Sequence, residues 1–227
     1  MSKVLAVVAH PDDEILGVGG TLIKHSQNND EVYCLILGEG MTSRTENRGK
    51  TDDNKLEELH NASLEAAEII GIEELYFSNF PDNRFDSIDL LDIIKEVEKY
   101  IEKINPEIIY THYHGDLNID HKRTFQAVIT ACRPIGNYNV KAIYAFETPS
   151  STEWSFGNNN EKFSPNVFVD IERNLPQKLK AMECYQSEIR DYPHPRSTKA
   201  LETIAARWGI VVGKKYVEPF KLIRKVK

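Results

Sequence analysis

Val4-Leu-Ala-Val-Val-Ala-His10-Pro-Asp12-Asp13-Glu14 is the stretch that decides the fold of this chain. Its apolar half is typical of a strand buried on both faces of a parallel sheet. Its polar half holds one imidazole and three carboxylates. In open α/β sheets, ligand sites form just beyond the carboxyl ends of the strands. The stretch therefore predicts a central strand that ends in a metal site with an activated water.

Strand and helix patterns alternate along the rest of the chain. Short apolar runs predict strands at 3–9, 32–37, 75–77, 107–112, 142–146, 167–169 and 216–222. Helical periodicity predicts helices at 22–26, 56–70, 90–101, 120–132, 174–189 and 197–208. This alternation indicates the α/β class, and we expect a Rossmann-like three-layer sandwich with a mainly parallel sheet. No repeat or linker interrupts the pattern, so we expect a single domain over residues 1–227.

Composition excludes several classes of protein. The net charge of -7 argues against a nucleic-acid surface, and we expect the basic run 221–227 to be a solvated tail. No apolar stretch reaches the roughly 20 residues of a membrane span, and there is no signal-peptide pattern, so we expect a cytoplasmic protein. The three widely spaced cysteines suit reduced thiols rather than disulfides. Whether the chain forms a homo-oligomer stays open.

The first polar cluster predicts a metal site. His10 and Asp13 are three residues apart in one turn, and the segment His112–His121 follows a second buried strand and can supply a further ligand. Catalytic zinc sites commonly use three protein ligands of these types, and imidazoles favour Zn²⁺ over Mg²⁺. The alternative is that the carboxylates only offset a helix dipole. We also expect Asp120 to N-cap the helix that follows.

These two segments resemble the LmbE-like (PIG-L) family of zinc-dependent N-deacetylases. The resemblance lies in Ala9–Glu14, in Gly19-Gly20 and in Asn118-Ile-Asp-His121, and it extends loosely over 37–40, 80–82, 192–196 and 213–220. It implies a Rossmann-like fold, one Zn²⁺ per chain and the removal of an acetyl group from an amino sugar.

The resemblance assigns a role to each matching residue. It implies that His10, Asp13 and His121 are the zinc ligands. Asp12 corresponds to the general base, and Asp120 to an acid that orients a neighbouring catalytic histidine. Glu14 either supports the ligands or is a first-turn carboxylate of the helix.

One position departs from the family pattern. The family has His-x-Asp-His, but Asn118 replaces its first histidine, which is expected to stabilise the oxyanion. An Asn amide can also donate to a developing oxyanion. The other candidate donors are Arg44, with Arg48 as the second choice, His194 in the stiff Pro-His-Pro segment, and His112 or His114.

A polar substrate also needs polar residues around the site. We expect Asp116, Arg84 and Arg196 to bind substrate hydroxyls, and Trp154 to contact a sugar face, although each could be a surface or packing residue. The leading hypothesis is a zinc-dependent hydrolase that removes the N-acetyl group from a GlcNAc-type sugar. The alternatives are a zinc amidase for another N-acylated small molecule and a non-catalytic sugar-binding relative. A nucleotide-binding protein is disfavoured, because the Gly17-x-Gly19-Gly20 match is weak and three carboxylates precede it.

Overall fold

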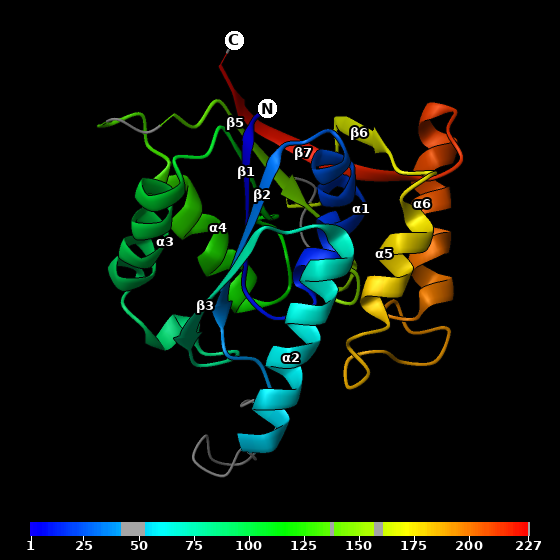
Figure 1. Cartoon of the computed structure of the whole chain (residues 1–227), viewed down its shortest axis with the longest axis horizontal. Coiled ribbons are helices and arrows are strands. Elements are labelled where there is room, and N and C mark those ends of the chain that lie inside the picture. Colours follow the sequence, from blue (N-terminus) through cyan, green and yellow to red (C-terminus); the bar gives the residue numbers. More distant parts are fainter. Residues whose placement is uncertain (42–52, 137–138, 157–160, 227) are drawn as a thin grey trace.

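A computed structural model of the chain describes residues 1–41, 53–136, 139–156 and 161–226 (Figure 1). The strands are β1 Lys3–Val8, β2 Glu31–Gly38, β3 Glu74–Phe80, β4 Ile108–His112, β5 Ala142–Phe146, β6 Val167–Asp170 and β7 Val217–Lys225. The helices are α1 Asp13–Gln27, α2 Asp53–Ile70, α3 Leu90–Ile104, α4 Ile119–Ala131, α5 Leu175–Met182 and α6 Thr198–Val212, with 3-10 turns η3 Phe85–Ser87 and η4 Glu153–Ser155.

The strands form one seven-stranded sheet in the order β3-β2-β1-β4-β5-β7-β6. The first five strands of this order run parallel, and β7 is antiparallel to both of its neighbours. The sheet is therefore mixed but mainly parallel, which confirms the predicted α/β class.

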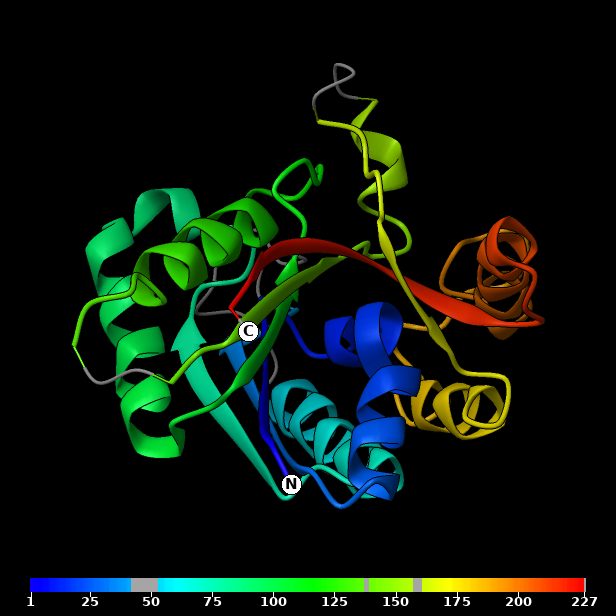
Figure 2. The same cartoon turned by 90° about the horizontal axis from the view of Figure 1, so that it is seen from above.

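Helices cover both faces of this sheet. Helices α3 and α4 lie on one face, and α1, α2 and α5 lie on the other (Figures 1 and 2). Strand β1 is buried between them: Val4, Ala6 and Val8 pack into the core on the α1 side, whereas Leu5 and Val7 pack into the core on the α3 side. Burial on both faces is what the uninterrupted apolar run predicts.

Helix α1 begins earlier than the sequence pattern indicates. We expected the glycines at 17, 19 and 20 to precede the helix, but all three lie inside α1. Close packing explains two of them. A Cβ atom on Gly17 would collide with the ring of Phe146 in β5, and one on Gly20 would lie 3.0 Å from Ile171. These glycines therefore let α1 approach neighbouring elements rather than form a turn.

Two other expectations about the C-terminal half are wrong. The basic run from Lys221 is not a solvated tail, because β7 continues to Lys225 and pairs with β5, and Arg224 donates to the carbonyl of Cys132 at 2.7 Å. Helix α5 ends at Met182 rather than near residue 189. Turns after it, with backbone bonds from Tyr185 to Met182 and from Glu188 to Tyr185, bring Tyr185 and Glu188 into the interior.

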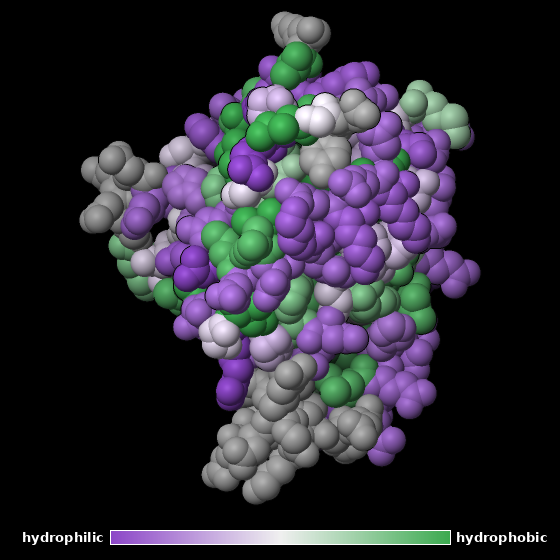
Figure 3. All heavy atoms as spheres, turned by 90° about the vertical axis from the view of Figure 1, so that its left-hand side faces the viewer, coloured by the Kyte–Doolittle hydropathy of each residue, from purple (hydrophilic) through white to green (hydrophobic). Residues whose placement is uncertain are grey.

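The surface over α3 and α4 is mostly hydrophilic, with separate apolar patches (Figure 3). Among the described residues, no helix has both the length and the apolar character needed to cross a membrane.

Candidate active site

The candidate site lies where the direction of chain progression across the sheet reverses. From β1 the chain moves through α1 to β2 on one side, whereas β4 lies on the other side of β1. Crevices outside the carboxyl ends of strands at such a switch point are where α/β proteins bind ligands. His10 follows β1 closely, and the segment that leads to His121 follows β4. The topology therefore brings the two polar segments of the sequence together.

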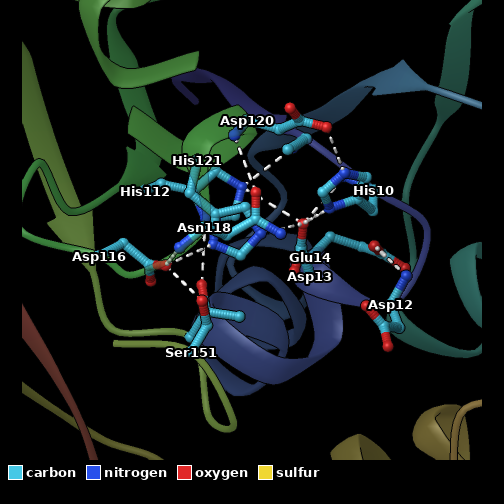
Figure 4. Close-up of polar contacts among 12 residues, drawn as sticks. His10, Asp12, Asp13, Glu14, His112, Asp116, Asn118, Asp120, His121 and Ser151 are labelled. Atoms are coloured by element: carbon cyan, nitrogen blue, oxygen red, sulfur yellow. Dashed lines mark hydrogen bonds and ion pairs between the residues drawn. The ribbon is translucent and has the colours of Figure 1, made fainter. Parts of the chain in front are cut away.

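Three side chains converge at this point (Figure 4). His10, Asp13 and His121 each offer a ligand atom within 4.8 Å of the others. Asp13 Oδ2 lies 3.4 Å from Nδ1 of His10 and 3.4 Å from Nε2 of His121. A second group, formed by His10, Asp82 and Asp120, also meets this 4.8 Å criterion.

A tight turn before α1 fixes the positions of the His10 and Asp13 side chains. Asp12 has a φ of 95°, in the left-handed region that non-glycine residues rarely adopt. The amide of His10 donates to Asp13 Oδ2 at 2.8 Å, and the carbonyl of Asp12 accepts the first helical bonds from Ile15 and Leu16. Strained backbone of this kind is found most often at functional sites.

Each histidine of the cluster has a carboxylate on its other ring nitrogen. His10 Nε2 lies 2.9 Å from Asp120 Oδ2, and His121 Nδ1 lies 3.1 Å from Asp116 Oδ1. Asp120 is itself held by the backbone amides of Asn83 and Phe85, at 2.6 and 2.9 Å. Carboxylate–histidine pairs of this type orient the imidazoles that bind metals.

Asp116 is not at the surface of the site, contrary to its expected role in contacting substrate. It is fully buried, and both of its oxygens are engaged. Besides His121, its partners are the Ser151 hydroxyl, the Thr152 hydroxyl at 2.6 Å and the backbone amide of Asn118 at 2.8 Å. Figure 4 shows it between the histidine rings and Ser151.

The donor set suits a cation. Asp13 Oδ1 is buried without a hydrogen-bond partner among the described residues, so the carboxylate is left with unused acceptor capacity. Burial alone would raise the pKa of Asp13, but His121 and His112 hold it well below its ordinary value. Burial lowers the pKa of His121, but Asp13 and Asp116 outweigh burial and raise it to about 9. Two imidazoles and one carboxylate at these separations match the ligand types of catalytic zinc sites.

Asp12 lies beside this cluster and faces a charged pair. Its Oδ2 is 3.0 Å from the Arg196 guanidinium, and the same nitrogen of Arg196 contacts Glu188 at 2.8 Å. Arg196 also donates to the Ser150 hydroxyl at 2.9 Å. Burial raises the pKa of Asp12 well above its ordinary value, while Arg196 opposes that shift.

Glu14 fits both roles that the sequence left open. It lies in the first turn of α1, and it is also buried against the site. One oxygen accepts from the Asp12 amide at 3.2 Å, and the other accepts from the Tyr185 hydroxyl. Burial raises its pKa to about 7, which Tyr185 partly opposes.

Asn118, rather than Asp120, is the N-cap of α4. Its side-chain oxygen accepts from the amide of Asp120 at 2.8 Å, so the prediction that Asp120 caps this helix is wrong. Its amide nitrogen donates to Asn83 at 2.9 Å. Asn118 also lines a cavity of about 80 Å³ beside the cluster. The lining residues are His10, Pro11, Asp12, Gly40, Met41, Leu59, Asp82, Asn83, Asn118, Glu188 and Arg196.

The three histidines that were candidate oxyanion donors do not line this cavity. His112 is fully buried, accepts from the Ala9 amide at 2.9 Å and stacks on His121. His114 is exposed and packs on Tyr113. His194 is half-buried, and the Trp154 ring meets it edge-on at 5.7 Å.

Three further sequence candidates have different outcomes. Arg84 is exposed and does not line the cavity, whereas Arg196 does line it. Arg44, like its second choice Arg48, lies outside the described residues.

Two charged residues of the cavity were not predicted. Asp82 lies 3.2 Å from His10 Nε2, and Glu188 is buried against Arg196. Asp82 carried a signal, since Phe80-Pro-Asp82 is one of the looser matches to the family. No feature of the sequence indicated that Glu188 belongs to the site, because a single glutamate in a helix-like stretch is most often a surface residue.

Comparison with known proteins identifies the family of this chain. The sequence profile of the PIG-L family, described as GlcNAc-PI de-N-acetylase, matches residues 5–132. The diacetylchitobiose deacetylase of Thermococcus kodakarensis is 27% identical, over 98% of this chain and 84% of that protein. A probable N-acetyl-alpha-D-glucosaminyl L-malate deacetylase 2 of Bacillus anthracis is 28% identical, over 82% and 81%.

Solved structures share the fold. The conserved protein TT1542 of Thermus thermophilus superposes with a TM-score of 0.78 at 23% identity, covering 100% of this chain and 97% of that one. Its similarity extends from β1 to β7, beyond the region that the family profile matches. The chain belongs to the PIG-L (LmbE-like) family.

Proposed function

We propose that this chain is a zinc-dependent N-deacetylase that removes the acetyl group from a GlcNAc-type amino sugar. The observation that carries the proposal is the convergence of His10, Asp13 and His121 beside Asp12 at the switch point of the sheet. The relatives named above are deacetylases of acetylated amino sugars, which supports the same substrate class.

His10, Asp13 and His121 would hold the metal. Bound Zn²⁺ would lower the pKa of a water and polarise the amide carbonyl. Asp120 and Asp116 contact the other nitrogen of each imidazole ring, and in the zinc-bound form they would orient the rings so that the nitrogens facing Asp13 bind the metal. The role that we propose for Asp120 is therefore to orient His10, and Asp116 takes the same role for His121 in place of a substrate contact.

Asp12 would act as the general base. It lines the cavity, it is not a member of the ligand cluster, and its turn conformation holds it beside the ligands. After accepting a proton from the attacking water, it can deliver that proton to the departing amine. Arg196, fixed by Glu188 and Ser150, keeps the Asp12 side chain in place and offers N–H groups to substrate hydroxyls.

Asn118 is our candidate for the oxyanion donor. Its oxygen accepts from the α4 backbone, and its amide nitrogen, which also lies at the cavity wall, donates one hydrogen to Asn83 and keeps a second for an oxyanion. Loss of one such donor typically costs ~10²–10³ in rate. Arg44 and His194 remain the other proposed donors.

The test is a comparison of metal content and acetate release. The purified protein should contain about one zinc per chain, and Asp12→Asn should keep that zinc while losing at least ~10²-fold of its acetate release from N-acetylated amino sugars. Asp86→Asn, at an exposed acid of η3, is the matched control and should keep full activity. A fully active Asp12→Asn variant would show that Asp12 is not the base.

A panel of substrates separates the alternatives. Acetate release from N-acetyl amino acids, without release from sugars, would favour an amidase of another class. Zinc binding without any hydrolysis would favour a non-catalytic relative.

A further inference from the structure

The backbone conformation of Asp12 sets the direction in which its carboxylate points. Among the described residues, Asp12 Oδ2 has no hydrogen-bond partner, although the Arg196 guanidinium lies 3.0 Å away. The φ of 95° lies in the left-handed region, which is unfavourable for a residue with a Cβ atom. A residue stays in such a conformation only when the contacts around it impose it. The groups that hold the Asp12 backbone therefore also place its carboxylate.

Glu14 holds this backbone through a hydrogen bond. The carbonyl of Asp12 accepts from Ile15 and Leu16 as α1 begins, but the first amides of a helix have no partner within the helix. Oε2 of Glu14 accepts from the Asp12 amide at 3.2 Å (Figure 4). Glu14 thus satisfies the buried amide of the residue whose backbone is strained.

Tyr185 in turn holds Glu14. Its hydroxyl donates to Oε1 of Glu14, and both side chains are buried. Tyr185 lies in the turn after α5, where its amide donates to the carbonyl of Met182 at 3.0 Å. A buried carboxylate is unfavourable unless hydrogen-bond donors replace the water that it has lost. Removal of the Tyr185 hydroxyl would take away one of these donors and release one end of the Glu14 carboxylate.

The same turn reaches Asp12 by a second route. Glu188 lies three residues after Tyr185, and its amide donates to the Tyr185 carbonyl at 2.9 Å. Its carboxylate contacts the nitrogen of Arg196 that lies beside Asp12 Oδ2. An apolar pair could fill the space of Tyr185 and Glu14 without burying a charge. Core packing alone therefore does not explain why two polar side chains of one turn lead to the amide and the carboxylate of one residue.

We propose that Tyr185 is a positioning residue for the deacetylation, and that it acts through Glu14 on the backbone of Asp12. This inference rests on the proposed function, in which Asp12 is the general base. Tyr185 belongs neither to the ligand cluster nor to the lining of the small cavity. A base must lie within hydrogen-bond reach of the proton that it accepts, and a small displacement of it slows the reaction. Loss of the hydroxyl should therefore change kcat rather than KM or the zinc content.

The kinetic test removes the hydroxyl and keeps the ring. Tyr185→Phe should lower kcat for acetate release from N-acetylglucosamine by about tenfold, while KM and the zinc affinity change less than about twofold. Tyr110→Phe is the matched control, because Tyr110 is also buried and its hydroxyl contacts His25 in the last turn of the same helix. The control should keep its full kcat. Equal losses in the two variants, or a full kcat in Tyr185→Phe, would overturn the proposal.

Combined variants test the route from Tyr185 to Asp12. In an Asp12→Asn background, Tyr185→Phe should change the residual rate by less than about twofold, because the group through which it acts is already gone. The same loss in both backgrounds would indicate a general disturbance of the fold and would overturn the proposal.

Glu14→Gln interrupts the same route in the middle. An amide cannot accept from both the Tyr185 hydroxyl and the Asp12 amide on its two ends, so kcat should fall as it does in Tyr185→Phe. Combining the two substitutions should cost little more than either alone. If Tyr185→Phe does not fold, Glu14→Gln carries the test, and a full kcat in that variant would overturn the proposal.

Crystal structures of the wild type and Tyr185→Phe separate this inference from the proposed function. In the variant, Asp12 should leave the left-handed region or its carboxylate should move away from Arg196, and neither change depends on hydrolysis. An Asp12 placed as in the wild type would overturn the inference even if the protein deacetylates sugars. A displaced Asp12 in a protein whose wild type releases no acetate would leave the positioning role standing and reject the deacetylase.

Discussion

Four aspartates near the site show what a sequence can and cannot assign. Asp12, Asp13, Asp116 and Asp120 all follow predicted strands, and residue type alone cannot distinguish a ligand from a base or an orienting group. Burial and partners separate them in the structure: Asp13 meets three imidazoles, Asp12 faces Arg196, and each of the other two contacts one histidine of the ligand cluster. Asp116 was misplaced because its hydroxyl partners come from a distant loop that carries no recognisable motif.

At this scale we predict that Asp116→Asn weakens zinc binding by about 10–100-fold. The carboxylate of Asp116 fixes the ring of His121 and raises its basicity, and an amide does both less well. Competition with a chromophoric chelator measures the change.

The exposed acid Asp86 provides the comparison, since Asp86→Asn removes one negative charge from the chain without touching a histidine. If both variants bind zinc equally tightly, the Asp116–His121 contact has no part in holding the metal.

At the scale of elements, the local sequence pattern predicts that a helix or strand exists better than it predicts where that element begins and ends. The strand 142–146 was predicted with its observed limits, and β1, β2 and β4 were within about two residues. Boundaries failed where long-range packing overrides local preference. Helix α1 keeps Gly17 because Phe146 of β5 lies against it, and β7 extends through a basic run because β5 and β6 both pair with it.

The glycines of α1 give a matched prediction. Gly17→Ala should destabilise the protein by about 1–3 kcal/mol, because its Cβ would collide with Phe146 in a packed core. Gly19→Ala should stabilise it by up to about 1 kcal/mol, because alanine favours a helix and the nearest atoms would be at an ordinary 3.5 Å.

Urea unfolding of both variants at one pH measures these changes. Similar effects of the two substitutions would mean that helical propensity, and not the contact of Gly17 with β5, determines how each substitution changes the free energy of unfolding.

At the scale of the whole molecule, the site depends on a strand order that no local pattern reveals. The sequence predicted that two strand ends carry ligands, but not that β4 is the neighbour of β1. That adjacency places His121 from α4 against His10, which lies far earlier in the chain. Residues 42–52, which include Arg44, are outside the described residues, so this candidate stays a prediction.

Because the ligands come from both sides of the switch point, we predict that zinc stabilises residues 1–227 as a single cooperative unit. Calorimetry should give one unfolding transition, and zinc at about 100 times its Kd should raise the Tm by about 5–10 °C. In the metal-free protein, acidic neighbours raise the pKa of His121 to about 9, so zinc must displace a proton at lower pH. Protonated His121 stabilises the metal-free fold at pH values below its pKa in the unfolded chain, about 6.5. This stability is lost as the pH rises from 6.5 through its pKa in the folded chain, about 9.

The zinc-induced increase in Tm should therefore grow between pH 6.5 and 9. The His121→Ala variant is the control, since it lacks a ligand and should show little increase at any pH. Two separate transitions, of which zinc shifts one, would contradict a single domain. An increase that shrinks toward pH 9 would contradict displacement of a proton from His121, because only the metal-free state loses stability as that group deprotonates.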